Sequence, residues 1–290
     1  MLSDISVEEI SRRQALGHQG DSLPGQARYG KELQHYNIKS ASDQDIVEIR
    51  KLLAVHGLLI FRDQVLEDHH LIHFSRRLGS GKIEAPPKAF NSPSDSIAYL
   101  TNLKKPDGSA LGFAADSTDV WHSDQEFREA PASIAMLYCL IPTDNEGATS
   151  FATTAVDNLD IDPSELSELR KLWSTRQAAS IVAHPVVETN PFTGNEFIYI
   201  SENTRQFIGP DGESIADSDK KAAYLLEKIL KPENIYSHPW KQGDVLLYDN
   251  MQLVHRREAY QGIRFLKAVK FHPDGEYVVR PAGKMLQSPQ

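Results

Sequence analysis

Apolar residues recur at helical spacing near the start of this 290-residue chain and in short β-rich runs over most of the remainder. A stripe with steps of three or four positions begins after Ser42 and ends at Gly57, which predicts a helix with Ser42 at its N-cap. The stripe consists of Ile46, Ile49, Leu52 and Leu53. A short buried strand over residues 58–61 and a second helix over residues 66–78 are predicted to follow.

The middle and C-terminal parts of the chain contain many short β-rich segments, separated by Gly, Pro and Asn. We predict strands at residues 133–140, 149–153, 179–187, 197–200, 244–248, 253–257 and 265–271. One helix, over residues 218–230, interrupts the series. Many short strands between turns favour a sandwich or barrel over a parallel sheet, so the predicted fold class is mainly β with flanking helices.

The chain is predicted to contain one large domain between two terminal segments. Residues 1–28 are interpreted as a short helix over residues 6–16 and a Gly-rich linker. The pattern of a packed domain then extends over residues 29–280. Residues 281–290 are predicted to form a loose tail.

Composition and charge narrow the functional classes. The chain has 31 Lys plus Arg and 40 Asp plus Glu, which gives a formal net charge of −9. Nucleic acids and anionic membranes are therefore not expected as partners, because both require clustered cations. No apolar run approaches the roughly 18 residues of a membrane span, and the N-terminus lacks the apolar core of a secretion signal. A single cysteine, Cys139, fits a reducing compartment, so we predict a cytoplasmic protein.

The segment Asp119-Val-Trp-His122-Ser-Asp124 carries the sharpest local signal of chemistry. On a strand, residues two positions apart point to the same face, so His122 and Asp124 are predicted to project together. An imidazole and a carboxylate on one face supply two ligands of the 2-His-1-carboxylate arrangement of non-haem Fe(II) oxygenases. A His-x-Asp pair is common by chance and is weak evidence by itself. A metal site of this type would also need a second histidine from elsewhere in the chain.

His255, in an apolar strand near the C-terminal end, is the candidate third ligand. A core histidine that bonds a backbone carbonyl is the alternative interpretation. Arg264 follows nine residues later, and its guanidinium suits a planar carboxylate because it can bond both oxygens at once. For an isolated Arg, a surface ion pair is the ordinary interpretation.

Six ordered blocks of sequence resemble the taurine / 2,4-dichlorophenoxyacetate dioxygenase family of Fe(II)- and 2-oxoglutarate-dependent enzymes. The blocks are HGLLIFRDQ (56–64), RRLG (76–79), DVWHSDQEF (119–127), EGATSF (146–151), HPVVETNPFTGNEFIYI (184–200) and WKQGDVLLYDN (240–250), the last followed by His255. The resemblance extends over residues 29–275, and this breadth makes it more specific than any single motif.

The resemblance implies a fold, a set of cofactors and a site. The family fold is a double-stranded β-helix (jelly roll). Position by position, His122, Asp124 and His255 are the implied iron ligands, and Arg264 with Thr149 is implied to bind the distal carboxylate of 2-oxoglutarate. With O2 as the other cosubstrate, the implied reaction oxidises an unactivated C–H bond of a small organic molecule and yields succinate and CO2.

Departures from the family limit what the resemblance implies about the substrate. Ala268 stands where the taurine enzyme has a second Arg, four residues after Arg264, and Met251 stands where the family has Arg. Taurine is therefore not expected, and an anionic head group would need Lys267 or another cation. Three residues near the His-x-Asp motif are predicted to shape the substrate pocket, namely Phe113, Thr118 and Phe127.

Several alternatives stay open at this stage. Hydroxylation is expected, but desaturation or an oxidative rearrangement would use the same residues, and the substrate could be a natural-product or amino-acid-like intermediate. A zinc-dependent hydrolase with the same three ligands, or a non-catalytic binding module that keeps the barrel, are the other classes of function. A homo-oligomer is open as well, because family members often form dimers or tetramers.

Overall fold

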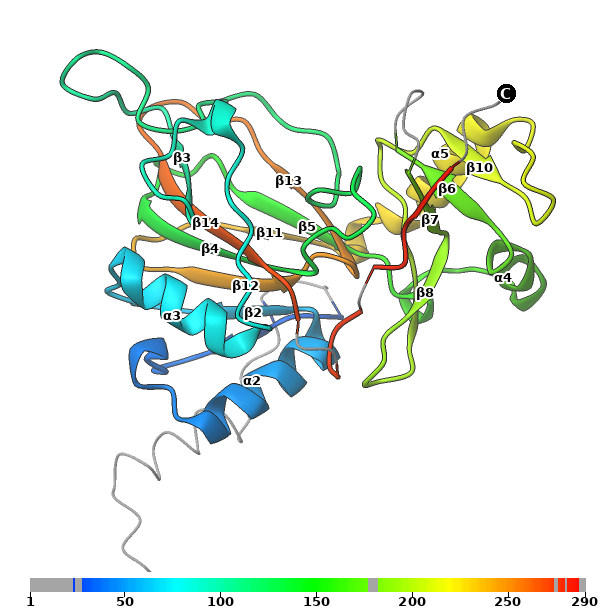
Figure 1. The fold of residues 1–290 in the computed structure, drawn as a ribbon, viewed down its shortest axis with the longest axis horizontal. Coiled ribbons are helices and arrows are strands. Elements are labelled where there is room, and N and C mark those ends of the chain that lie inside the picture. The colour runs from blue at the N-terminus through cyan, green and yellow to red at the C-terminus, as the bar shows by residue number, and fades with distance from the viewer. Residues whose placement is uncertain (1–22, 24–27, 177–181, 274–275, 280, 287–290) are drawn as a thin grey trace, which may run out of the picture.

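The computed structural model describes residues 23, 28–176, 182–273, 276–279 and 281–286, and two facing β-sheets form its centre (Figure 1). In this part of the chain the larger sheet has six strands. In sheet order they are β1 (Lys31–Leu33), β2 (Leu58–Phe61), β12 (Val245–Asp249), β4 (Ile134–Ile141), β14 (Phe265–Phe271) and β3 (Ala98–Thr101). The smaller sheet consists of β11 (Ile235–His238), β5 (Thr149–Thr153) and β13 (Leu253–Arg257).

Side chains alternate along these strands between the space inside the two sheets and the outer face of the larger sheet. On β14, Leu266 and Ala268 pack with residues of the smaller sheet, whereas Val269 and Phe271 pack on the outer side. The same alternation on β12 places Tyr248 between the sheets. Inward positions of these strands are therefore available to line a site.

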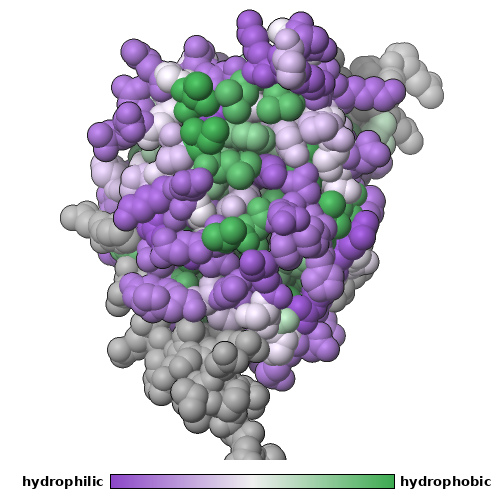
Figure 2. Space-filling model, turned by 90° about the vertical axis from the view of Figure 1, so that its left-hand side faces the viewer, coloured by the Kyte–Doolittle hydropathy of each residue, from purple (hydrophilic) through white to green (hydrophobic). Residues whose placement is uncertain are grey.

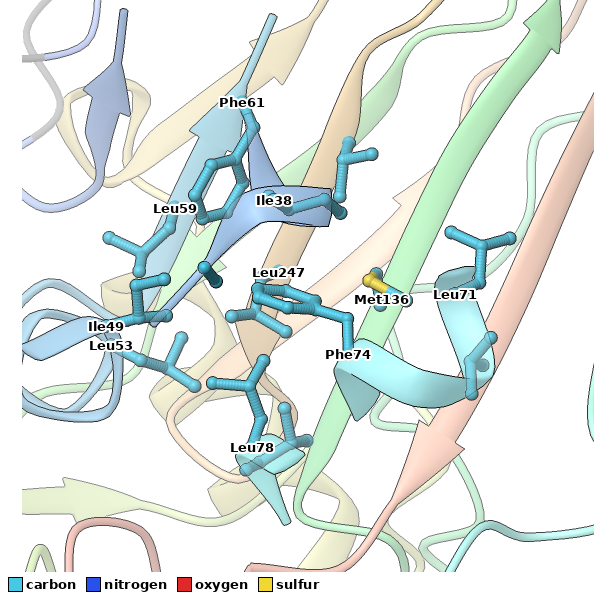
Figure 3. Close-up of a cluster of buried hydrophobic side chains, with 14 of the residues drawn as sticks. Ile38, Ile49, Leu53, Leu59, Phe61, Leu71, Phe74, Leu78, Met136 and Leu247 are labelled. Carbon is cyan, nitrogen blue, oxygen red and sulfur yellow. The ribbon is translucent and has the colours of Figure 1, made fainter. Parts of the chain in front are cut away.

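Helices cover the outer face of the larger sheet (Figure 1). Helix α2 (Asp43–His56) begins at Ser42, which forms a capping box with Asp45, and it ends at Gly57 in the left-handed conformation (φ 70°). Helix α3 (Asp68–Leu78) lies beside it. Figure 3 shows apolar side chains of both helices packed on strand residues. They are Ile49, Leu53, Leu71, Phe74 and Leu78 from the helices, and Leu59, Phe61, Met136 and Leu247 from the sheet.

An insert between β5 and β11 lies at one end of the two sheets (Figure 1). It contains α4 (Pro163–Leu169), α5 (Ser218–Ile229), β6 (Trp173–Thr175), β7 (Val182–Pro185), β8 (Val187–Thr189), β9 (Glu196–Ile198) and β10 (Gln206–Ile208). Strand β15 (Lys284–Met285) pairs with β7. Trp121 belongs to the apolar cluster of the insert and directly precedes His122, so the insert supports the segment that carries the candidate ligands.

The predicted fold class, mainly β with flanking helices, is confirmed. The two N-terminal helices, α5, β2, β5, β13 and β14 lie within two residues of their predicted positions. Strands β1, β3, β6, β10 and β11 were not predicted, because runs of three or four residues carry little periodic signal. The single strand predicted over residues 179–187 is wrong in its described part, which contains two strands, β7 and β8. The predicted helix at residues 6–16 lies outside the described residues, and the predicted tail contains β15. Single 3-10 turns occur at Ile38–Ser40, Lys88–Phe90, Val156–Asn158 and Pro232–Asn234.

Among the helices that the structure describes, none is both long enough and apolar enough to cross a membrane. Figure 2 shows the face that lies on the left in Figure 1. Hydrophilic side chains predominate on this face, and apolar ones gather mainly near its top. Most large apolar residues lie instead in the buried clusters on either side of the larger sheet.

Phe74 is a sensitive test of the packing between helices and sheet. It is 2% exposed, and its ring lies edge-on to that of Phe61, with centroids 6.2 Å apart. Phe74→Ala should lower the free energy of unfolding by about 3–5 kcal/mol, because it leaves a cavity in a close-packed layer. Urea denaturation measures this change. The control Phe127→Ala, at a position 53% exposed, should change stability by less than about 0.5 kcal/mol, and equal effects would contradict the packing.

Candidate metal and cosubstrate site

Two backbone hydrogen bonds join the segment around His122 to strand β13. His122 N donates to His255 O (3.0 Å), and His255 N donates to His122 O (2.9 Å). The two residues form an isolated antiparallel bridge, so their side chains lie opposite each other on one face. The ring centroids are 4.5 Å apart. Two segments that are distant in the sequence thus supply adjacent imidazoles.

Asp124 joins the two histidines from a turn. Only His122 makes a bridge, and residues 124–127 form a turn in which Gln125 has a φ of 60°. The prediction that His122 and Asp124 share a strand is therefore wrong, because the chain enters the turn directly after the bridge. Ser123 still points away, with its hydroxyl toward Leu253 O (3.5 Å), and His122 and Asp124 project into the same space.

Asn250 holds this turn in place. Its Oδ1 accepts a hydrogen bond from Asp124 N (2.7 Å), and its Nδ2 donates to Asp124 O (2.9 Å) and to Ala132 O (2.8 Å). The side chain is fully buried, so these bonds fix the Asp124 backbone against the turn between β12 and β13. Sequence analysis assigned no role to Asn250, although it lies in one of the six family blocks.

The potential ligand atoms of His122, Asp124 and His255 all lie within 4.8 Å of one another. His122 Nε2 is 3.8 Å from Asp124 Oδ1, and His255 Nε2 is 3.7 Å from Asp124 Oδ2. Two imidazoles and a carboxylate that converge from one side match the donor set of a 2-His-1-carboxylate metal centre. In the described part of the chain, no other three side chains of these types converge in this way.

Both imidazoles present Nε2 to the point of convergence. His122 Nδ1 lies 2.8 Å from Val120 O, and donation there leaves a lone pair on Nε2. Burial, together with the neighbouring imidazole of His122, lowers the pKa of His255 to about 3, so the His255 ring is neutral at neutral pH. A neutral imidazole is the form that binds a metal ion.

The groups around Asp124 keep its carboxyl group ionised. Burial alone would raise its pKa, but the Lys270 ammonium, 2.5 Å from Oδ1, and the two imidazoles together lower the pKa below its usual value. The Tyr248 hydroxyl donates to Oδ2 (3.1 Å). A buried, oriented carboxylate beside two imidazoles fits a divalent cation.

Arg264 and Thr149 line a cavity of about 140 Å³ that also contacts the three candidate ligands. Arg264 is 4% exposed, and no acidic side chain among the described residues forms an ion pair with it. Burial lowers its pKa to about 10, so the guanidinium is still a cation at neutral pH. Thr149 Oγ1 accepts a hydrogen bond from Trp240 Nε1 (3.1 Å), which leaves the hydroxyl proton free to donate. The Arg264 guanidinium and the Thr149 hydroxyl are both hydrogen-bond donors, and together they fit a carboxylate group.

A second cavity, of about 320 Å³, adjoins the first at the candidate ligands. The residues that line both cavities are Phe90, Ala98, His122, Asp124, Ala268 and Lys270. Apolar side chains, among them Pro86, Pro87 and Phe127, form much of its wall. Two of the three candidate ligands, His122 and Asp124, therefore lie where the two cavities meet.

Two of the three residues predicted to shape the substrate pocket line a cavity, and the third does not. Phe113 lines the first cavity, and its ring stacks on that of Phe90, with centroids 4.4 Å apart. Phe127 lines the second cavity. Thr118 is not among the residues that line either cavity, and its hydroxyl accepts a hydrogen bond from Ala259 N (3.1 Å).

Lys267 does not face the cavities. It lies on the outer side of β14, where its ammonium pairs with Asp68 (2.5 Å), so it does not meet the expectation for an anion-binding cation. Lys270 lines both cavities instead, because it shares the inward face of β14 with Leu266 and Ala268. The alternation along this strand places Lys267 and Lys270 on opposite faces, but it does not by itself indicate which face lines the cavities.

A core of two facing β-sheets that carries two histidines and one aspartate beside a buried arginine is the arrangement of a 2-oxoglutarate-dependent oxygenase. The profile of the taurine catabolism dioxygenase TauD, TfdA family matches residues 20–269. The chain therefore belongs to this family of alpha-ketoglutarate (2-oxoglutarate)-dependent dioxygenases, oxidoreductases that use Fe(II), 2-oxoglutarate and O2. The family resemblance and the jelly-roll fold predicted from the sequence are confirmed.

Relatives of this chain differ in what their names say they act on. The alpha-ketoglutarate-dependent 2,4-dichlorophenoxyacetate dioxygenase of Burkholderia sp. (strain RASC) is 26% identical over 76% of this chain and 82% of its own. An alkylsulfatase of Acinetobacter baylyi is 27% identical over 79% of this chain and 76% of its own. The crystal structure of a taurine dioxygenase from Burkholderia xenovorans has a TM-score of 0.72 at 18% identity, over 90% of this chain and 93% of its own, and this likeness concerns the fold.

Asn250→Ala tests whether the asparagine positions Asp124. The variant should bind Mn(II) about 10–100-fold more weakly, because a ligand whose backbone is no longer fixed loses its orientation. Calorimetry measures the affinity. The control is Asn190→Ala, another fully buried asparagine with three hydrogen bonds, to Ala54 O, Phe192 N and Thr193 N. Both variants should lose stability, but a similar Mn(II) affinity in the two would contradict the role of Asn250.

Proposed function

We propose that this protein oxidises a C–H bond of a small organic molecule, with Fe(II), 2-oxoglutarate and O2. In the hydroxylation that we favour, one oxygen atom of O2 enters the product and the other enters succinate, while 2-oxoglutarate loses CO2. One observation carries the proposal: three converging ligands line a cavity that also contains a buried guanidinium without a carboxylate partner among the described residues.

His122, Asp124 and His255 are proposed to hold Fe(II). When bound, this ion with 2-oxoglutarate and O2 supplies the oxidant for the C–H bond. The chain contributes orientation: Asn250 fixes the backbone of Asp124, the Tyr248 hydroxyl bonds its carboxylate, and Val120 O fixes the His122 ring. The three side chains converge from one side, which would leave the other side of a bound ion accessible to the cosubstrate and oxygen.

Arg264 and Thr149 are proposed to bind the distal carboxylate of 2-oxoglutarate. A guanidinium can bond both carboxylate oxygens, and the interaction gains strength because Arg264 is buried. Trp240 orients the Thr149 hydroxyl by donating to its oxygen. The apolar residues Leu137 and Leu266 line the same cavity and limit the entry of water.

Family membership favours the oxygenase over the zinc hydrolase and over the non-catalytic binding module. Relatives named for phenoxyacetates, alkyl sulfates and pentalenolactone support a small organic substrate for this chain too. Phe113 and Phe127 are proposed to contact it. A desaturation or rearrangement in place of hydroxylation, a homo-oligomer, a cytoplasmic location and the absence of nucleic-acid partners stay predictions.

Succinate formation is the direct test. The native protein should release succinate from 2-oxoglutarate in air with Fe(II), and a panel of small organic molecules should identify the substrate by stimulating this release. His122→Ala should retain less than about 1% of the rate, because it removes a metal ligand. The control His69→Ala, at a position with a side chain 68% exposed, should keep the native rate. Full activity of His122→Ala would exclude the proposed metal site.

Arg264→Met tests the cosubstrate site separately from turnover. The variant should bind 2-oxoglutarate about 100-fold more weakly in calorimetry with the Mn(II)-loaded protein, because a buried charge pair is lost. The control is Arg257→Met, which removes a cation that lines the same cavity but bonds Ser117 O and lies 3.8 Å from Asp119. It should change the affinity only a few-fold. Equal affinities in the two variants would assign the carboxylate to another residue.

A further inference from the structure

Two side-chain amides line the second cavity, those of Gln125 and Asn203. Gln125 directly follows the candidate ligand Asp124 in its turn, and Asn203 lies in the insert between β9 and β10. The proposed binding of Fe(II) and 2-oxoglutarate uses neither of them. The second cavity therefore has polar groups beside its apolar walls that the proposed reaction does not explain.

One half of each amide is held by a neighbouring group. Gln125 Oε1 accepts a hydrogen bond from Ala132 N (2.9 Å), and Asn203 Nδ2 donates to Glu126 Oε1 (2.7 Å). Arg176 donates to the other carboxylate oxygen of Glu126 (2.9 Å), so both oxygens act as acceptors. These partners fix the orientation of both amides, because a backbone N–H can only donate and such a carboxylate can only accept.

The other half of each amide is available to a bound molecule. In the described part of the chain, neither Gln125 Nε2 nor Asn203 Oδ1 has a hydrogen-bond partner, and neither atom is fully buried. Because an amide is planar, the bond on one half also restrains the direction of the other half. The cavity therefore offers N–H donors from one residue and a carbonyl acceptor from the other, both held in place before a molecule binds.

The charged side chains that line the second cavity are already paired. Glu84 bonds Arg128 (2.8 Å), Lys270 contacts Asp124 (2.5 Å), and Glu126 is bonded on both oxygens. A charged group on a bound molecule would have to compete with one of these pairs or lie in the cavity without a partner, and both cost free energy. A neutral polar group leaves every pair intact, so the cavity favours a neutral group.

An amide group matches the two free halves. Its carbonyl oxygen can accept from Gln125 Nε2, and its N–H can donate to Asn203 Oδ1. A ketone lacks the donor and leaves the Asn203 acceptor unpaired. A carboxylate lacks the donor as well and brings a second oxygen against that acceptor. Among these carbonyl groups, only the amide pairs with both side chains.

We propose that the substrate of the proposed oxygenase carries a neutral amide group, which Gln125 and Asn203 bind in the second cavity. This inference rests on the proposed function. A cavity of about 320 Å³ suits a small amide with an apolar body. The apolar residues that line it are Ala85, Pro86, Pro87, Phe90, Ala98, Phe127 and Ala268. Since His122 and Asp124 line the same cavity, C–H bonds of this body would lie close to the metal ligands.

Binding of isosteric ligands tests the inference without turnover. The protein is loaded with Mn(II) and N-oxalylglycine, an unreactive analogue of 2-oxoglutarate. Calorimetry then compares hexanamide with heptan-2-one and hexanoate, and phenylacetamide with phenylacetone and phenylacetate. In at least one series the native protein should bind the amide about tenfold more tightly than the ketone and the acid, because only the amide forms both hydrogen bonds.

Variants of the two amide residues should give different results. Asn203→Leu removes the acceptor, so the amide should lose its advantage over the ketone to within about twofold. Gln125→Met removes the donor that both carbonyl compounds use, so it should weaken amide and ketone alike, by about five- to tenfold, and keep their ratio. The matched control is Asn195→Leu, at an exposed position between β8 and β9 that lines neither cavity, and it should change neither affinity.

The outcomes separate this inference from the proposed function. A native protein that binds no amide more tightly than its ketone and its acid, or an Asn203→Leu variant that keeps the native ratio, would overturn the inference while Mn(II) and N-oxalylglycine still bind. A native protein that binds neither Mn(II) nor N-oxalylglycine would instead overturn the proposed function. Thermal unfolding shows that each variant is folded, and Mn(II) titration shows that its metal site is intact.

Discussion

A single antiparallel bridge between His122 and His255 brings the candidate site together. Strand β13 is fixed by its pairing with β5, where His255 lies opposite Phe151, and the bridge ties the preceding loop to that strand. Asn250, at the turn just before β13, then holds the other end of the loop at Asp124. All three ligands thus depend on one edge of the smaller sheet, and metal binding is expected to stabilise that edge.

Two cations that face the cavities, Arg264 and Lys270, differ in how their charge is compensated. Arg264 precedes β14 and Lys270 lies near its end, and both project between the sheets. A cation in an apolar space costs free energy unless an anion compensates it. Arg264 faces the first cavity without a carboxylate partner among the described residues, whereas Lys270 pairs with the candidate ligand Asp124. This strand and the residue before it thus supply two cations to the same cavity.

The insert contributes to the site through a buried ion pair. Arg176, 1% exposed, bonds Glu126 at 2.9 Å, and Glu126 belongs to the turn that carries Asp124. Asn203 bonds the same carboxylate from a second segment of the insert. On the far side of the larger sheet, α2 and α3 cover the outer face. The site thus lies between a rigid sheet and an insert that fixes the ligand-bearing turn.

Much of this arrangement is determined by local sequence. The apolar stripe of α2 between Ser42 and Gly57 and the β-rich runs of β5, β13 and β14 predict those elements, because each run extends over a full helical turn or several strand positions. The types of residue at His122, Asp124 and His255 limit the chemistry, since this donor set suits a divalent metal ion. The six blocks of family sequence also indicate the jelly-roll fold and the oxygenase class.

Only the tertiary structure decided how these residues meet. Nothing local indicates that Asp124 lies in a turn, that Asn250 clamps it, or that Trp240 orients Thr149, because each contact joins segments far apart in the chain. The register of β14 within its sheet also decides that Lys270, and not Lys267, faces the cavities. The local sequence does not indicate which face of a strand points inward. Only packing against β4 and the smaller sheet makes one face of β14 the wall of a cavity.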